Sequence, residues 1–212
     1  MVRLKAFLTI MLLASAACSD ANSPDVPMAL AKRRTLLDAP VATTSSTTDS
    51  ASREPSPIKL AEWAPPLTTY DTTFIAVQGK PSTHAIFFQQ QPWMTYPVKY
   101  MELNIPPGAE FVDADGMPVP RGTIVPITVH ADSGVISFEF GPHGSSFSER
   151  KPATLSVWWL FADLGSLSAA GLQVWYQGNS TEPWNALTTQ IDLAGAYLEA
   201  PIYHFSNYAV AW

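Results

Sequence analysis

The chain has 212 residues, a formal net charge of −6, 14% charged residues and 11% aromatic residues. From Leu60 onward it carries five basic and thirteen acidic residues, a net charge of −8. A body of this charge repels a phosphate backbone, which argues against nucleic acid as a partner.

The first twenty residues, "MVRLKAFLTIMLLASAACSD", have the layout of a targeting segment. Arg3 and Lys5 precede an apolar run over residues 6–13, and small residues follow. This order is typical of a secretory signal peptide. The run is shorter than the ~20 apolar residues that span a bilayer. We therefore expect residues 1–17 to be a signal peptide and the protein to be exported.

Cys18, the single cysteine of the chain, directly follows these small residues. The segment "SAAC" resembles the lipobox of bacterial lipoproteins, in which the cysteine becomes the lipid-bearing N-terminus. Ala16 and Ala17 match that pattern, whereas Ser15 stands where the family prefers leucine. The resemblance implies lipid attachment at Cys18 and a membrane anchor on the extracytoplasmic side of the cell envelope. Ordinary cleavage after Ala16 or Ala17, leaving Cys18 unmodified, is the alternative.

Residues 18–57 form the next segment, and its second half reads "APVATTSSTTDSASREPSP". This Ser/Thr/Pro/Ala tract has too few apolar side chains to offset the entropy of ordering the chain, so it predicts a disordered linker.

From residue 58 to residue 212 the apolar residues recur with period two, which predicts β-strands. In chain order the strands are expected within residues 72–78, 82–89, 98–106, 122–131, 134–141, 152–161, 171–178, 182–193, 196–202 and 204–212. One helical turn is expected within residues 164–171. Gly, Pro, Asp and Asn separate the strands. The sequence thus predicts one all-β domain, an antiparallel β-sandwich.

The alternation also predicts which side chains face the core. These are Met101, Leu103, Ile105, Val125, Ile127, Val129, Ile136, Phe138, Phe140, Leu155, Val157, Trp159, Phe161, Leu172, Val174 and Tyr176. It places Trp158 and Trp175 on outward faces. If their strands share a sheet, the two indoles form an exposed pair that can bind a sugar ring or a protein. Cover by a loop such as residues 63–66 is the alternative, and the favoured one.

Three stretches, "LNIPPGAEF", "ISFEFGPHGSSFSERKPATLSV" and "YHFSNYAVAW", resemble the β-sandwich domain of zonula-occludens proteins, netrin receptors and ankyrins, here called the ZU-five type. The resemblance covers residues 105–212. It implies a β-sandwich that acts as a protein-interaction platform. One branch of the family cuts its own chain between Phe and Ser of a His-Phe-Ser sequence.

The chain contains this tripeptide as His204-Phe205-Ser206. In a self-cleaving protein Ser206 would attack the carbonyl of Phe205, with His204 as the base, and the peptide between them would need strain. On an extended strand His204 and Ser206 would share a face. The favoured alternative is a structural role at the start of the last strand, with Tyr208, Val210 and Trp212 continuing that face.

The four histidines, His84, His130, His143 and His204, lack the spacing of metal ligands, and no cofactor motif is present. We therefore expect no metal and no cofactor. The sequence as a whole predicts a non-catalytic envelope protein that binds a partner or gives structural support. A self-cleaving domain and a glycan-binding module are the alternatives. The expected partners are the membrane, through the lipid anchor, and an envelope protein or polysaccharide.

Overall fold

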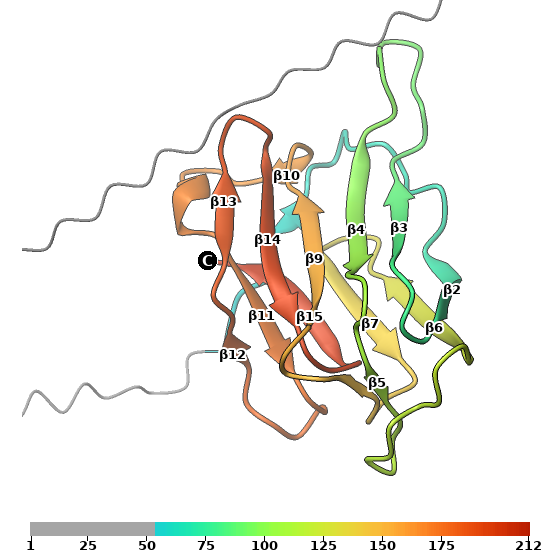
Figure 1. Ribbon diagram of the computed structural model, residues 1–212. Coiled ribbons are helices and arrows are strands. Elements are labelled where there is room, and N and C mark those ends of the chain that lie inside the picture. Colours follow the sequence, from blue (N-terminus) through green and yellow to red (C-terminus); the bar gives the residue numbers. More distant parts are fainter. Residues whose placement is uncertain (1–53) are drawn as a thin grey trace, which may run out of the picture. The chain divides into compact units, whose positions relative to one another are not determined.

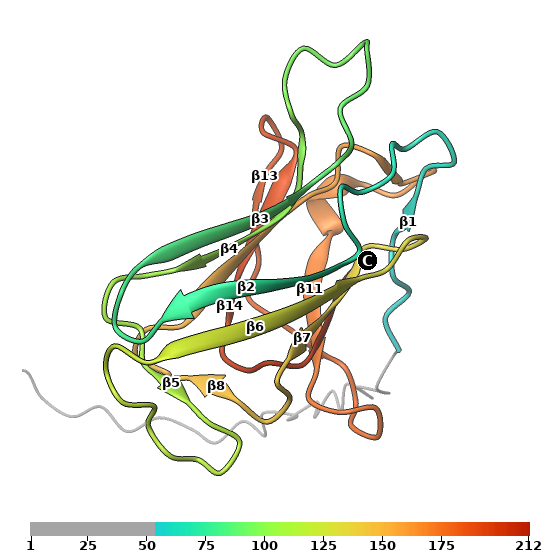
Figure 2. The same cartoon turned by 90° about the vertical axis from the view of Figure 1, so that its right-hand side faces the viewer.

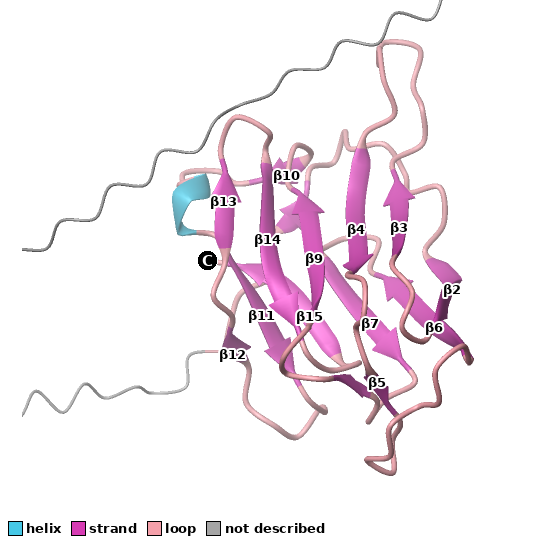
Figure 3. Cartoon of the chain, in the orientation of Figure 1, coloured by secondary structure: helices cyan, strands magenta, loops and turns pink. Residues whose placement is uncertain are grey.

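The computed structural model describes residues 54–212 (Figure 1). The expected signal peptide, Cys18 and the linker up to residue 53 lie outside the described residues. The described part is almost entirely strand and loop (Figure 3). The predicted antiparallel β-sandwich is confirmed.

Two antiparallel sheets form the layers of the sandwich (Figure 2). The six-stranded sheet has the order β12 (Asn185–Ala186), β11 (Gln173–Gln177), β15 (Asn207–Ala211), β7 (Ser137–Gly141), β6 (Ile124–Ala131) and β2 (Asp71–Val77). The five-stranded sheet has the order β13 (Gln190–Asp192), β14 (Tyr197–Ile202), β9 (Ala153–Trp158), β4 (Lys99–Ile105) and β3 (Ser82–Phe87). Two short pairs complete the fold: β1 (Lys59–Leu60) with β10 (Ala162–Asp163), and β5 (Phe111–Val112) with β8 (Ser146–Phe147).

The core lies between the two sheets and includes most of the side chains that the alternation assigns to inward faces. Of the sixteen predicted positions, all are buried except Val125, Trp159 and Tyr176, which are half-buried. A 3-10 turn, Ala169–Gly171, occupies the predicted helical position. Pro57, the last residue of the expected linker, forms a bridge with Ala211.

The last predicted strand is shorter than expected. β15 begins at Asn207, and Phe205 and Ser206 form a bend before it. This bend connects β14 of the five-stranded sheet to β15 of the six-stranded sheet, so the chain changes layers here. Four consecutive residues of β15, from Tyr208 to Ala211, are buried, and β15 lies between β11 and β7.

Three phenylalanines close the sandwich beside this bend. The Phe205 ring centroid lies 5.1 Å from that of Phe147 in β8 and 6.1 Å from that of Phe111 in β5. All three rings are buried. Phe205 therefore packs the bend between β14 and β15 against the small β5–β8 sheet.

None of the helical structure within residues 54–212 is long or apolar enough to cross a bilayer.

Candidate functional site: a polar groove on the six-stranded sheet

The His204-Phe205-Ser206 segment is held by backbone hydrogen bonds to neighbouring strands. Phe205 N donates to Ser145 O at 2.9 Å, and Ser206 O accepts from Phe140 N at 2.9 Å. His204 is exposed, whereas Ser206 is 1% exposed. The bend thus places the His204 side chain in solvent and the Ser206 side chain in the interior. The expectation that the two side chains share one strand face is wrong.

The surroundings of Ser206 do not bring a base to its hydroxyl. Ser206 Oγ is buried and forms no hydrogen bond with a histidine or a carboxylate within residues 54–212. The His204 ring instead lies beside Tyr176, with 6.3 Å between ring centroids. The only cis peptide within residues 54–212 joins Gly141 and Pro142, so the Phe205–Ser206 peptide is trans, and neither residue has a positive φ.

Tyr208 supports the bend from the core side. Its hydroxyl donates to His204 O at 2.6 Å. Burial raises the pKa of Tyr208 to about 12, against the opposing effects of contacts with Ser206 and with the His204 backbone. The phenol therefore stays protonated and keeps donating this hydrogen bond at any physiological pH.

Trp158 and Trp175 both face outward, as predicted, but they lie in different sheets and form no pair. Trp158 is in β9, where it stacks on Tyr197 at 5.4 Å and receives Lys99 Nζ 5.1 Å above its ring. Trp175 is in β11 of the six-stranded sheet, opposite Ala186 and Ala209. Both tryptophans are half-buried, and Nε1 of Trp175 is fully buried. In the residue 63–66 segment, the Trp63 indole packs edge-on against Phe161.

A row of polar residues crosses the outer face of the six-stranded sheet. Register places Asp71 of β2 beside His130 of β6, His130 beside Glu139 of β7, and Glu139 beside Asn207 of β15. Gln177 of β11 follows opposite Asn207. Side chains directly opposite each other on one sheet face are close enough to act on one ligand.

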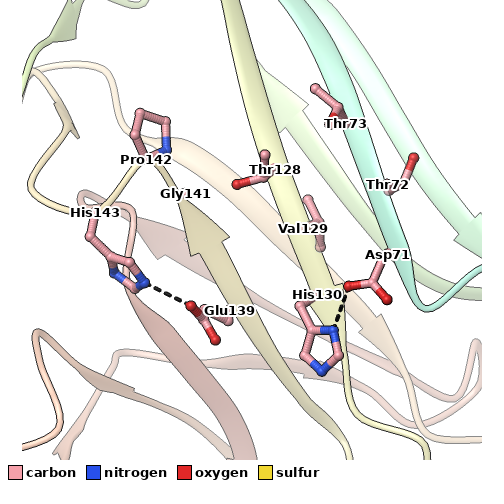
Figure 4. A pocket seen from close by; sticks show the side chains of 10 residues that line it. All are labelled: Asp71, Thr72, Thr73, Thr128, Val129, His130, Glu139, Gly141, Pro142 and His143. Carbon is pink, nitrogen blue, oxygen red and sulfur yellow. Dashed lines mark hydrogen bonds and ion pairs between the residues drawn. The ribbon is translucent and has the colours of Figure 1, made fainter.

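Two histidine–carboxylate pairs involve residues of this row, and His143, from the turn after β7, is a member of the second pair (Figure 4). His130 Nδ1 lies 2.7 Å from Asp71 Oδ1, and His143 Nε2 lies 2.8 Å from Glu139 Oε1. The hydrogen bond with Asp71 raises the pKa of His130 above its ordinary value, and the charges of Asp71 and Glu139 act in the same direction. Both pairs are solvent-exposed, so their contribution to folding stability is small.

The row borders a hollow of about 520 Å³ (Figure 4). Gly141 keeps part of this hollow open, because a Cβ at that position would collide with the hydroxyl of Thr128 on the next strand. Thr73 and Thr128 add hydroxyl groups to its lining.

A second hollow of about 280 Å³ adjoins the first, because His130 and Glu139 line both. Trp184, from the connection between β11 and β12, forms part of its wall, and Ser137 and Ala209 are small neighbours. We call the two hollows together the outer groove, lined by Asp71, Thr73, Thr128, His130, Ser137, Glu139, His143, Trp184, Asn207 and Ala209. It combines hydrogen-bonding groups over its length with an indole.

Within residues 54–212 each imidazole of the two pairs hydrogen-bonds to a carboxylate, and neither hydrogen-bonds to a hydroxyl or thiol. No group of three or more His, Cys, Asp or Glu side chains in the described part of the chain could hold a metal ion.

Sequence reasoning predicted no role for these residues. His130 is one of four histidines without the spacing of metal ligands, and nothing in the sequence distinguishes Glu139 from other charged residues. Their meeting depends on strand register between β2, β6, β7 and β15, which spacing along the chain does not reveal.

We expect the imidazole of His130 to titrate above 6.5 and that of His84 below it, as followed by NMR. Burial lowers the pKa of His84, whose ring stacks on Phe74 at 4.8 Å. Asp71→Asn removes the charged acceptor, so it should lower the His130 midpoint and leave that of His84 unchanged. An unchanged His130 midpoint in this variant would show that the pair does not form in solution.

Comparison of the chain with protein-family models, with curated proteins and with solved structures found no match.

Proposed function

We propose that the protein is a non-catalytic, lipid-anchored binding module of the cell envelope, and that the outer groove binds a glycan. The carrying observation is that the indole of Trp184 lines the same hollow as His130 and Glu139, which belong to the polar row and also line the adjoining hollow. The expected signal peptide and the lipobox-like segment that ends at Cys18 support a location in the envelope. The ZU-five resemblance supports a binding role, since that domain serves as an interaction platform.

A glycan suits this groove because a sugar ring has both an apolar C–H face and a rim of hydroxyls. The C–H face packs on an indole, and the hydroxyls exchange hydrogen bonds with carboxylates, imidazoles and threonines. The combined hollows are in the size range of small-ligand sites. The half-buried Trp184 offers surface without the mobility of a long side chain.

The test is retention on purified envelope polysaccharide together with titration by soluble oligomers of N-acetylglucosamine and of glucose. Trp184→Ala is expected to weaken binding about tenfold or more, as for a central aromatic contact. Glu139→Gln should also weaken binding, because it removes the charged acceptor from the centre of the row.

Trp158→Ala is the matched control, since it removes an outward-facing indole from the opposite sheet. Its binding should equal that of the wild type. Equal losses in Trp158→Ala and Trp184→Ala, or no binding of any of these sugars by the wild type, would contradict a glycan site in the outer groove.

A further inference from the structure

A second surface, which is apolar where the outer groove is polar, consists of exposed side chains at one end of the sandwich. Trp63 is 65% exposed, Trp93 62%, Tyr96 76% and Leu160 50%. They belong to three connections: β1–β2, β3–β4 and β9–β10. We call these four residues the aromatic end. In Figures 1 and 2 the β3–β4 connection, which carries Trp93 and Tyr96, projects beyond the strands it joins.

Buried Phe161 holds these connections together. The Trp63 and Trp93 rings lie edge-on to it at centroid distances of 5.5 and 6.1 Å. Ala61 N donates to Phe161 O at 2.9 Å. The indoles therefore rest on the core, and their exposure is built into the fold.

The β1–β2 and β3–β4 connections are also joined directly. Gln89 N donates to Pro66 O at 2.7 Å, and Leu67 forms a bridge with Phe88. Adjacent backbones thus present Trp63 and Trp93 as one surface.

The aromatic end is almost uncharged, in contrast to the rest of the domain. Across residues 61–70, 88–98 and 159–161 the only charged side chain is Glu62. From Glu54 onward the chain has six basic and fourteen acidic residues, a net charge of −8. The aromatic end therefore offers a partner apolar side chains and almost no charge with which to form ion pairs.

We propose that the aromatic end inserts into the interface of a lipid bilayer with zwitterionic headgroups. Trp and Tyr favour this interface because their rings are apolar and their N–H and O–H groups can reach headgroups and water. Leu160 adds an aliphatic side chain, which suits acyl chains and has no face to stack on a sugar ring. This observation favours lipid over glycan as the occupant.

The inference rests on the proposed function, because the anchor at Cys18 supplies the nearby bilayer. Thirty-five residues separate Cys18 from Glu54. A fully extended chain of this length spans up to ~120 Å. The eight-residue strand β6 is only ~27 Å long, so the chain can span several strand lengths. Either end of the domain can therefore reach the membrane, and a weak insertion suffices once the anchor keeps the domain close.

The experiment uses the single cysteine to fix the protein to vesicles by chemistry. The chain from Cys18 onward is coupled through its thiol to maleimide lipids in phosphatidylcholine vesicles, with or without brominated acyl chains. Bromine quenches only those indoles that enter the bilayer. The wild type is expected to lose fluorescence with brominated lipid. The Trp63→Phe/Trp93→Phe variant should show no such loss, and Trp158→Phe/Trp184→Phe should retain it.

Equal quenching in the wild type and the Trp63→Phe/Trp93→Phe variant would overturn the proposal. A second outcome would also overturn it. In that outcome brominated lipid does not quench the wild type, and N-acetylglucosamine oligomers change the fluorescence of Trp63 and Trp93, which would assign this end to a glycan. Because coupling is chemical, the result does not depend on whether cells lipidate Cys18. Sugar binding at the outer groove is read out separately, so each proposal can fail alone.

Discussion

Replacing Phe205 with alanine is expected to lower the free energy of unfolding by about 3–5 kcal/mol. The side chain is 1% exposed and its ring packs against Phe111 and Phe147. Removing it leaves a cavity where the chain passes from the five-stranded to the six-stranded sheet. Urea unfolding curves of the wild type and the variant would measure the loss.

His204→Ala is the matched control, because it alters the same tripeptide at an exposed position. It should change the free energy of unfolding by no more than about 0.5 kcal/mol. A loss as large as that of Phe205→Ala would contradict the packing account of the motif. Intact mass adds an independent check: the wild type and Ser206→Ala should share one C-terminus. A wild type that lacks the last seven residues, restored in Ser206→Ala, would instead support self-cleavage.

Replacing Cys18 with serine is expected to move the protein from the membrane fraction to the soluble fraction. A serine offers no thiol for lipid attachment, and each buried CH₂ of an acyl chain contributes about 0.8 kcal/mol to membrane affinity. The contact proposed for the aromatic end is too weak to hold the protein through washing without the anchor. Fractionation followed by immunoblotting measures the change.

Trp158→Ala, which leaves Cys18 intact, should remain in the membrane fraction. Unchanged partitioning of Cys18→Ser would refute lipidation at this position and favour ordinary cleavage after Ala16 or Ala17.

The alternation of apolar residues was sufficient to predict the core. Met101, Leu103 and Ile105 are buried as expected, because a strand with one covered face has a side-chain period of two. Each strand carries this information locally. The fold class followed from the same local patterns repeated between turn residues.

The assignment of strands to sheets was not predictable in the same way. The outward orientation of Trp158 and Trp175 was correct, yet β9 and β11 belong to opposite sheets. Alternation defines the two faces of one strand and leaves open which strand lies beside it. The same limit applies to the bend at Phe205, since "HFSNYAV" continues the pattern of a strand through the residues where the chain changes layers.

The outer groove lay beyond sequence reasoning for a related reason. Asp71, His130 and Glu139 are brought together only by pairing between strands, and Glu139 alone in "SFEFG" looks like any solvent-facing residue. Only Gly141 carried a usable signal, because glycine inside a strand often marks a close approach of another group. Here that group is Thr128, and the missing side chain leaves part of the groove open.

The place of β15 within its sheet bears on how the domain folds. β15 follows all its partners along the chain, yet it lies between β7 and β11. Without residues 207–211 the β12–β11 pair has no connection to β7, β6 and β2, and the six-stranded sheet remains in two parts. Contacts of long sequence separation of this kind slow folding. In a growing polypeptide the six-stranded sheet would therefore stay in two parts until β15 is available to join them.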